Sequence, residues 1–428
     1  MPERNDRTPD EIRREQEKRP ESKETAEAPE SASPELRERA AVDREIADTE
    51  ESAAETTAAI DSARQEFADD PEAQAELDAL MGTSEKARER MAQIEGEIAR
   101  EDLLEGVNEG IQTAIELVRA RFEDTDSEKD KLPFHQGNHT SDVATRTRKI
   151  LEAIQRGAPD KVDDRTVQIG QLVGAFHDTV QRWVPNEVKG PEGDVRIMRK
   201  RLQTPANPEK NDNPVDEATG KPYAGNETAS AAEAVAFIDG FNAKRREDGL
   251  PEVFTEEDKR VAERAIDHTV PLFVFEKGTV VQPRLKEESD IISRAVALAD
   301  LGEAGMNPEG FESAGDLLFR EENLDILDAS KDPKALSDAQ KEFYRKRMLG
   351  WSKFQPKFAA GRKAELEKEL AGLPEAAAAE VRKLFTRFDE SIAAVNAVAA
   401  RRETMTFEEL LKDMGYGSDG PEAAEKAA

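Results

Sequence analysis

Apolar residues recur at intervals of three and four along most of this chain, and this spacing most constrains the fold. In IQTAIELVRARF, residues 111–122, apolar side chains such as Ile111 and Ile115 mark the broad buried face of a helix. Similar patterns continue to about residue 305 and resume through 336–413, and no alternating strand pattern of any length is apparent. The spacing therefore predicts an all-α fold.

The charge balance restricts the partners of the chain. Its 93 acidic residues outnumber its 62 basic residues, giving a net charge of −31. Such a surface repels phosphate backbones, so we expect no binding to nucleic-acid duplexes or to anionic membranes. No leader-like apolar segment opens the sequence, and no run approaches the roughly 20 apolar residues of a membrane span. We expect a cytoplasmic protein.

Composition and spacing divide the chain into five predicted segments. These are a disordered acidic tail at 1–35, a helical or coiled-coil segment at 36–105, a metal-dependent hydrolase domain at 106–310 with an insertion at 185–225, a C-terminal helical extension packed on that domain at 311–416, and a disordered tail at 417–428.

The 36–105 segment carries a thin apolar stripe, which favours a coiled coil or a partner helix over a core. Pro71 stands where a helix can begin, and MGTSEKARE at 81–89 offers a break followed by Ser84 as an N-cap. Two or three helices are therefore expected. A protein partner or self-association would use this segment.

The strongest sign of chemistry is a set of ionisable residues on apolar helix faces. His139 shares a face with Val143, His177 follows an apolar run and precedes Asp178, and Asp300 falls one turn after Val296. Burying a carboxylate costs several kcal/mol unless a cation meets it. There is no cysteine, so a metal would be held by His, Asp or Glu. Taken singly, each residue also fits a hydrogen-bonded core position.

These residues resemble a known family. The order His139, His177-Asp178, Asp300 is similar to the H…HD…D signature of the HD superfamily of metal-dependent phosphohydrolases, whose fold is a helical bundle. FHQGNHTSDV resembles the opening motif of an uncharacterised branch with Y-H-N-x-x-H-x-x-x-V, NETASAAEAVAFI its N-E-x-x-S-A segment, and ALADLGEAG its closing D-A-D-L. The resemblance covers about residues 111–310.

The resemblance implies roles for several residues. Metal ligands would be His139, His177, Asp178 and Asp300, with Mn²⁺, Mg²⁺, Fe²⁺, Co²⁺ or Zn²⁺ as the divalent ion. Asp178 is the expected proton acceptor, and Glu227 would lie near the metal or be a first-turn helix acid. His135 and His268 would contact phosphate or complete a second metal site.

Departures from the family motifs disfavour two classes of substrate, alarmones and cyclic dinucleotides. HDTVQRW lacks the Glu-Asp pair that follows HD in alarmone hydrolases, and no G-Y-P motif follows as in cyclic-dinucleotide phosphodiesterases. Leu298 replaces the first aspartate of D-A-D-L, which leaves Asp300 as the candidate there.

A basic run, RIMRKRLQ, lies in the predicted insertion. One interpretation is a solvated loop. The other is that Arg199 and Arg201, with their neighbours, close over the site and bind phosphate oxygens. The stripe of Trp351, Phe354 and Phe358 further along is expected to be core packing.

The sequence thus predicts a phosphohydrolase that cleaves a small anionic, nucleotide-like phosphoester through a metal-activated water. Two alternatives stay open. One is a non-catalytic helical scaffold with a vestigial site, and the other is an HD-type di-iron oxygenase.

Overall fold

The computed structural model describes residues 71–205, 213–216 and 220–416, together with single residues between 44 and 64. The chain divides into two compact units, one of residues 1–98 and 242–252 and the other of 99–241 and 253–428. The predicted disordered tails lie outside the described residues. Helices dominate the described part, which confirms the all-α prediction.

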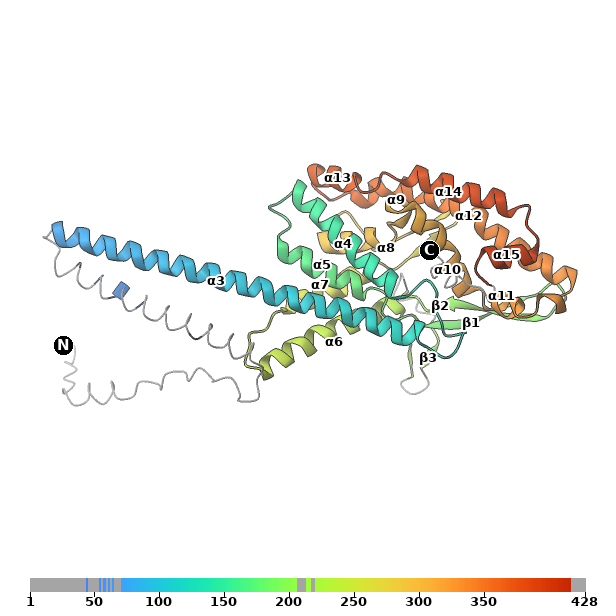
Figure 1. Cartoon of the computed structure of the whole chain (residues 1–428), viewed down its shortest axis with the longest axis horizontal. Helices are drawn as coiled ribbons and strands as arrows, with labels where there is room; N and C mark the ends of the chain where they lie inside the picture. Colours follow the sequence, from blue (N-terminus) through green and yellow to red (C-terminus); the bar gives the residue numbers. More distant parts are fainter. Residues whose placement is uncertain are drawn as a thin grey trace, which may run out of the picture. The chain divides into compact units, whose positions relative to one another are not determined.

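The first unit contributes most of helix α3, Pro71–Val118 (Figure 1). The helix begins at Pro71 as predicted, but the break expected near Ser84 was wrong, because all 48 residues form one helix. A glycine inside a helix, such as Gly82, costs only about 1 kcal/mol, and the helix formers around it offset that cost. A π-helical turn, η1 (Arg119–Glu123), follows α3.

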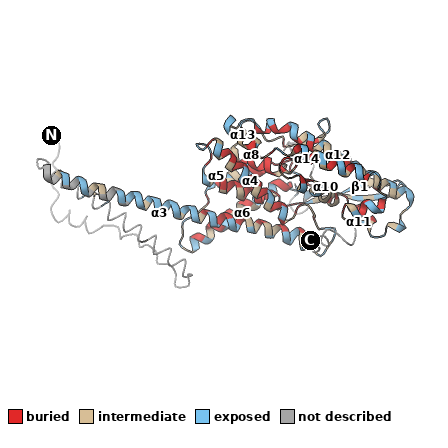
Figure 2. Cartoon of the chain, turned by 45° about the horizontal axis from the view of Figure 1, so that its top comes forward, coloured by how far each residue is buried: buried red, intermediate tan, exposed pale blue. Residues whose placement is uncertain are grey.

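The core of the second unit is a group of packed helices. Helix α4 (Gly137–Gly157) packs on α5 (Asp164–Phe176), α8 (Ile291–Asp300) and α13 (Glu375–Arg382), and α7 (Glu256–Asp267) packs on α5 and α8. Figure 2 shows the buried faces of α4, α5 and α8 in the central part of this unit.

Helices α4 and α5 approach each other closely because glycine stands at the contact. A Cβ atom at Gly174 would lie 2.6 Å from Thr147 Oγ1, and one at Gly170 would lie 2.2 Å from Leu151 Cδ1. Asp163 caps α5 by accepting a hydrogen bond from the Thr166 amide at 2.8 Å. The ends of these helices are therefore held in fixed positions.

The C-terminal helices belong to the same compact unit. They are α9 (Glu303–Met306), α10 (Pro308–Glu322), α11 (Leu324–Ser330), the 3₁₀ turn η3 (Pro333–Ala335), α12 (Asp338–Leu370), α14 (Phe388–Arg402) and α15 (Phe407–Asp413). The long α12 packs on α14, α8 and α9.

In the described part of the chain, three short antiparallel strand pairs, which no alternating sequence pattern indicated, interrupt the helices. The pairs are β1 (Trp183–Lys189) with β2 (Val195–Arg201), β3 (Val215–Asp216) with β4 (Lys221–Pro222), and β5 (Leu272–Val274) with β6 (Thr279–Val281). The first pair occupies the start of the predicted insertion, and Gly193, with φ of 83°, lies in its turn. Helix α6 (Asn226–Glu247) follows β4.

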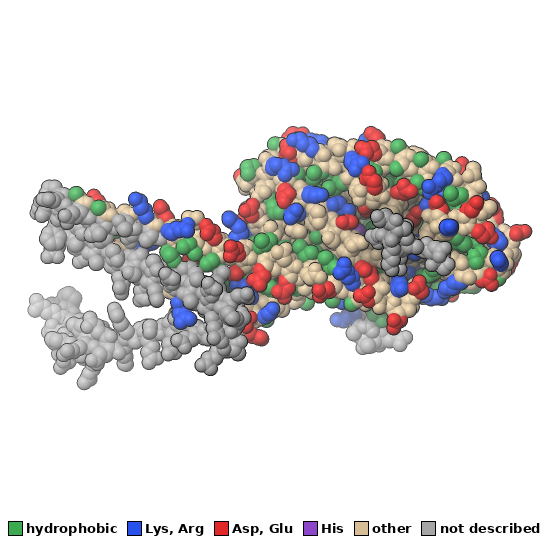
Figure 3. Space-filling view, viewed as in Figure 1, with side chains coloured by type: hydrophobic (Ala, Val, Ile, Leu, Met, Phe, Trp, Pro, Cys, Tyr) green, Lys and Arg blue, Asp and Glu red, His purple; other side chains and the backbone are tan. Residues whose placement is uncertain are grey.

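None of the described helices combines the length and the apolar character needed to cross a membrane. Figure 3 shows acidic and basic side chains intermingled over the visible face of the second unit.

Candidate metal centre

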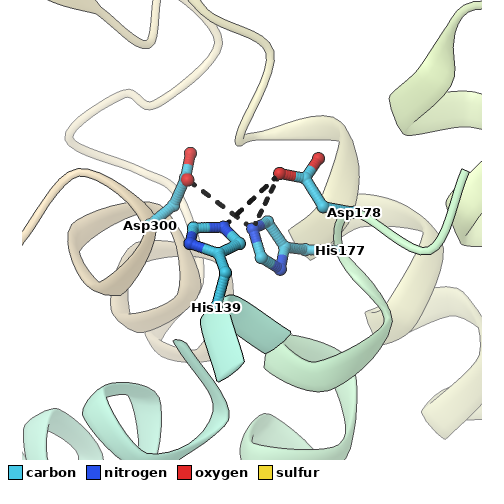
Figure 4. Close-up of side chains that lie close together, drawn as sticks. All are labelled: His139, His177, Asp178 and Asp300. Carbon is cyan, nitrogen blue, oxygen red and sulfur yellow. Dashed lines mark ion pairs between the residues drawn. The ribbon is translucent and has the colours of Figure 1, made fainter. Parts of the chain in front are cut away.

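Four side chains from three helices converge in the second unit (Figure 4). His139 lies in the first turn of α4, His177 and Asp178 follow α5 directly, and Asp300 is the last residue of α8. Their ligand atoms all lie within 4.8 Å of one another. A group of this size could hold one divalent ion bound at about 2.0–2.2 Å.

Asp178 is the centre of this cluster. Its Oδ2 atom lies 3.2 Å from His177 Nε2, 3.7 Å from His139 Nε2 and 3.5 Å from His135 Nε2. Asp300 Oδ1 lies 3.5 Å from His177 Nε2. One carboxylate oxygen therefore faces three imidazoles, and a second carboxylate faces one of them.

Two ring nitrogens have no hydrogen-bond partner although they are buried. The Nε2 atoms of His139 and His177 both point into the cluster without a hydrogen bond of acceptable geometry. The other ring nitrogen of His177, Nδ1, lies 2.8 Å from the Gly174 carbonyl oxygen, which fixes the ring and directs Nε2 toward the two carboxylates. Buried polar atoms without partners are costly, and a bound cation would satisfy both.

The electrostatics of the cluster also favour a cation. Burial lowers the pKa of His139 to about 4, so this imidazole is neutral and available as a ligand. Burial opposes charge on His177 as well, but the carboxylates of Asp178 and Asp300 outweigh it and raise its pKa to about 10. The same two carboxylates would stabilise a metal ion.

The second oxygen of Asp178 is held by neighbours from other elements. Asp178 Oδ1 accepts hydrogen bonds from Gln181 Nε2 at 2.7 Å and from Arg201 Nη2 at 2.8 Å. Gln181 Oε1 in turn accepts from Arg201 Nε at 2.8 Å and from Asn226 Nδ2 at 3.1 Å. Burial opposes the charged form of Asp178, yet His177 and Arg201 hold its pKa well below the usual range. These contacts orient Oδ2 toward the imidazoles.

Side chains of the segment NETASA, residues 226–231, accept hydrogen bonds from the backbone of the loop after His177. Asn226 Oδ1 accepts from the Arg182 amide at 2.8 Å, and Ser230 Oγ accepts from the Val180 amide at 3.0 Å. Glu227 is 1% exposed, and its Oε2 accepts from the Thr204 amide at 2.7 Å while Oε1 has no partner. Glu227 thus keeps one carboxylate oxygen free in a buried position.

His135 is held by a residue that the sequence did not indicate. Its Nδ1 lies 2.7 Å from Glu321 Oε2, and Glu321 Oε1 accepts hydrogen bonds from the Phe134 and His135 amides at 2.8 Å each. Both His135 and Glu321 are buried. This arrangement directs His135 Nε2 toward Asp178. Glu321 lies 186 residues further along the chain, in an ordinary helical pattern that gave no signal.

Two other predicted site residues, His268 and Arg199, contact backbone carbonyl oxygens rather than the His/Asp cluster. His268 caps α7, and its Nδ1 lies 2.6 Å from the Arg264 carbonyl oxygen. Arg199 donates to the carbonyl oxygens of Glu321 at 2.8 Å, Lys129 at 2.7 Å and Lys131 at 3.2 Å. Of the basic run, Arg201 contacts the centre, whereas Arg199 ties strand β2 to neighbouring segments.

A cavity of about 240 Å³ borders the centre. Its described polar lining includes His135, Asp178, Arg201, Asp300, Glu303 and Glu322. Its aromatic lining consists of Phe134, Phe311, Trp351, Phe354 and Phe358. The stripe at 351–358 was expected to be packing alone. Its rings do pack together, but they also form a wall of this cavity.

Comparison with models of protein families, with curated proteins and with solved structures gives no match for this chain. The geometry alone shows a buried group of His and Asp side chains that could hold a metal ion, which fits a metal-dependent enzyme.

Proposed function

We propose that this protein is a metal-dependent phosphohydrolase that cleaves a small phosphomonoester. The observation that carries the proposal is the pair of unpartnered, buried Nε2 atoms of His139 and His177, which converge with two carboxylates beside a cavity. The resemblance of the motifs to the HD superfamily supports the same activity.

A divalent ion held by His139, His177, Asp178 and Asp300 would lower the pKa of its water and neutralise charge on a phosphoryl oxygen. Arg201 lines the cavity and would donate to a phosphate oxygen beside its bond to Asp178. Its planar guanidinium can make both contacts at once.

Residues around the centre would also accept and donate the protons that hydrolysis transfers. The water oxygen bonds to phosphorus, the ester P–O bond breaks, and its electron pair goes to the leaving oxygen. The water proton would pass to the carboxylate of Asp178, which lines the cavity. His135, which lines the cavity and is fixed by Glu321, is positioned to return a proton to the leaving oxygen.

Two measurements test the proposal. Elemental analysis of the purified protein should find about one divalent ion per chain, as expected for one four-residue site. Turnover of p-nitrophenyl phosphate with Mn²⁺, Mg²⁺, Co²⁺, Fe²⁺ or Zn²⁺ should then exceed that of the metal-free protein. Metal without hydrolysis of any phosphoester in a broad panel would contradict the proposal and favour a scaffold, and about two irons per chain would favour an oxygenase.

A further inference from the structure

The cavity beside the metal centre has more negative charge than phosphate binding requires. Of the described residues that line it, four are carboxylates (Asp178, Asp300, Glu303 and Glu322) and one, Arg201, carries a guanidinium. A divalent ion would leave these groups with a net charge of −1 when His135 is neutral. A substrate with several phosphates would therefore meet repulsion beyond its first phosphoryl group.

Glu322 is the least compensated of these carboxylates. It lies at the end of α10, and no hydrogen bond or ion pair joins it to another described residue, whereas Glu303 accepts from Asn307 Nδ2 at 3.3 Å and lies 4.0 Å from Arg146 Nη1. Burial raises the pKa of Glu322 to about 6, so the carboxylate is still mostly ionised at neutral pH. Its environment would become more favourable if a ligand brought a positive charge.

Aromatic rings supply the rest of the wall. Trp351 and Phe354 have ring centroids 5.7 Å apart, and Phe354 and Phe358 have centroids 6.1 Å apart, so the three form a continuous row along α12. Trp351 Nε1 donates to the Gly315 carbonyl oxygen at 2.9 Å, which fixes the indole. On the metal side, Phe134 lies 4.5 Å from the His139 ring, centroid to centroid.

Aromatic rings and a carboxylate without a hydrogen bond or ion pair, lining one cavity, favour an organic cation, because ring faces are electronegative and stabilise ammonium groups. We propose that the cavity binds a phosphomonoester whose alcohol portion carries an alkylammonium group. The phosphate faces the metal ligands and Arg201, and the ammonium group lies among the aromatic rings near Glu322. This inference rests on the proposed function for its reaction but not for its binding site.

The volume of the cavity agrees with such a ligand. About 240 Å³ is below the roughly 300–1,000 Å³ of sites for drug-sized molecules. A compact zwitterion suits this space. Its phosphate would face the metal and Arg201, and its ammonium group would face the side chain of Glu322.

The test compares two substrates of nearly equal shape. Phosphocholine carries a trimethylammonium group, and 3,3-dimethylbutyl phosphate carries a neutral tert-butyl group in its place. With the metal-loaded full chain, kcat/KM for phosphocholine should be at least about tenfold higher, a typical effect of cation recognition in a desolvated site. Glu322→Gln should reduce this ratio toward one. Glu312→Gln, a change on the same helix at a residue that does not line the cavity, should leave the ratio unchanged.

A binding experiment separates this inference from the reaction. The chain has two tryptophans, so Trp183→Phe leaves Trp351 as the fluorescent reporter in the cavity wall. Choline should change its emission in a saturable way, and 3,3-dimethylbutanol should do so much less. Choline binding without turnover of phosphocholine or of any other phosphoester in the panel would support the cation site while contradicting the proposed hydrolase. Equal kcat/KM for the two phosphates, or equal binding of the two alcohols, would overturn the cation site and leave the hydrolase standing.

Discussion

The metal ligands and the cavity wall come from different parts of the chain and are specified in different ways. The ligands lie on α4, at the end of α5 and on α8, each next to an apolar helix face. The aromatic wall comes mainly from α10 and α12, and Arg201 comes from strand β2. The ligands thus follow local helix periodicity, whereas the wall depends on long-range packing of the C-terminal helices against the ligand-bearing ones.

This difference teaches where chemistry and selectivity reside in the molecule. Under the proposed function, changes at the candidate ligands should abolish hydrolysis of every substrate, because a bound metal would supply the attacking water. Changes at the wall should alter which substrate is preferred and how stable the protein is. The following predictions test that separation, beginning with the largest effect.

His177→Ala and Asp178→Asn should each remove the metal and lower kcat by about 1,000-fold or more, because each deletes a ligand and the metal supplies the nucleophile. Metal content and turnover are measured together, with far-UV circular dichroism as the check on folding. Breaking a buried ionic cluster can itself cost about 3–5 kcal/mol. Full metal content in both folded variants would show that the centre lies elsewhere.

Arg201→Gln should lower kcat/KM by about 10–100-fold, because it removes a hydrogen bond that orients Asp178 and a donor to phosphate. Arg199→Gln is the matched control on the same strand. It loses bonds to three backbone carbonyls, so it should lower the free energy of unfolding by about 1–3 kcal/mol and change kcat/KM little. Equal losses of kcat/KM in both variants would contradict the distinction between the two arginines.

Glu322→Gln should stabilise the protein at neutral pH. The carboxyl group has a pKa of about 6 when folded, above its ordinary value of 4.5, so wild-type stability is greater at low pH and falls as pH rises from 4.5 through 6. Because the glutamine amide does not ionise, Glu322→Gln should raise the free energy of unfolding by about 2 kcal/mol above pH 6 and change it little at pH 4.5. Urea unfolding at pH 4.5 and pH 8 measures both values. A gain of the same size at both would exclude the ionised carboxylate as its cause.

Removal of residues 1–98 should have the smallest effect. None of the described residues of this stretch belongs to the His/Asp cluster or lines the cavity, and the stretch ends before Leu103 and Val107, which are buried in the core. We expect kcat/KM to stay within about twofold of the full chain, with metal content as the control. A folded truncated protein that has lost turnover would show that the first unit takes part in catalysis.

The sequence predicted the helical fold and the placement of the ligands because both follow from local rules. His139, His177 and Asp300 each stand where a helix turns an apolar face inward, and the chain lacks cysteine to offer another ligand. The order of these residues then matched a known motif. Such information is contained within one or two helical turns.

The cavity, and the contacts that hold its lining residues in place, could not be predicted from local sequence patterns. Glu321 meets His135 across 186 residues, and Trp351 lies in a stripe that any buried helix face would show. Strand β2 was hidden because its apolar residues do not alternate regularly, with Ile197 next to Met198, and because Val195 and Ile197 are exposed rather than buried. Only tertiary packing decides which of these side chains border a cavity.

The hydrogen bond between Arg201 and Asp178 makes the β1–β2 hairpin and the metal site thermodynamically interdependent. If metal binding strengthens that bond, it must also reduce the opening of the hairpin, which amide hydrogen exchange would record as slower exchange in β2. Reciprocity requires the converse by the same factor, so a molecule that draws the hairpin away from Asp178 would weaken metal binding by that factor. The hairpin would therefore couple an event at the protein surface to the affinity of the candidate metal site.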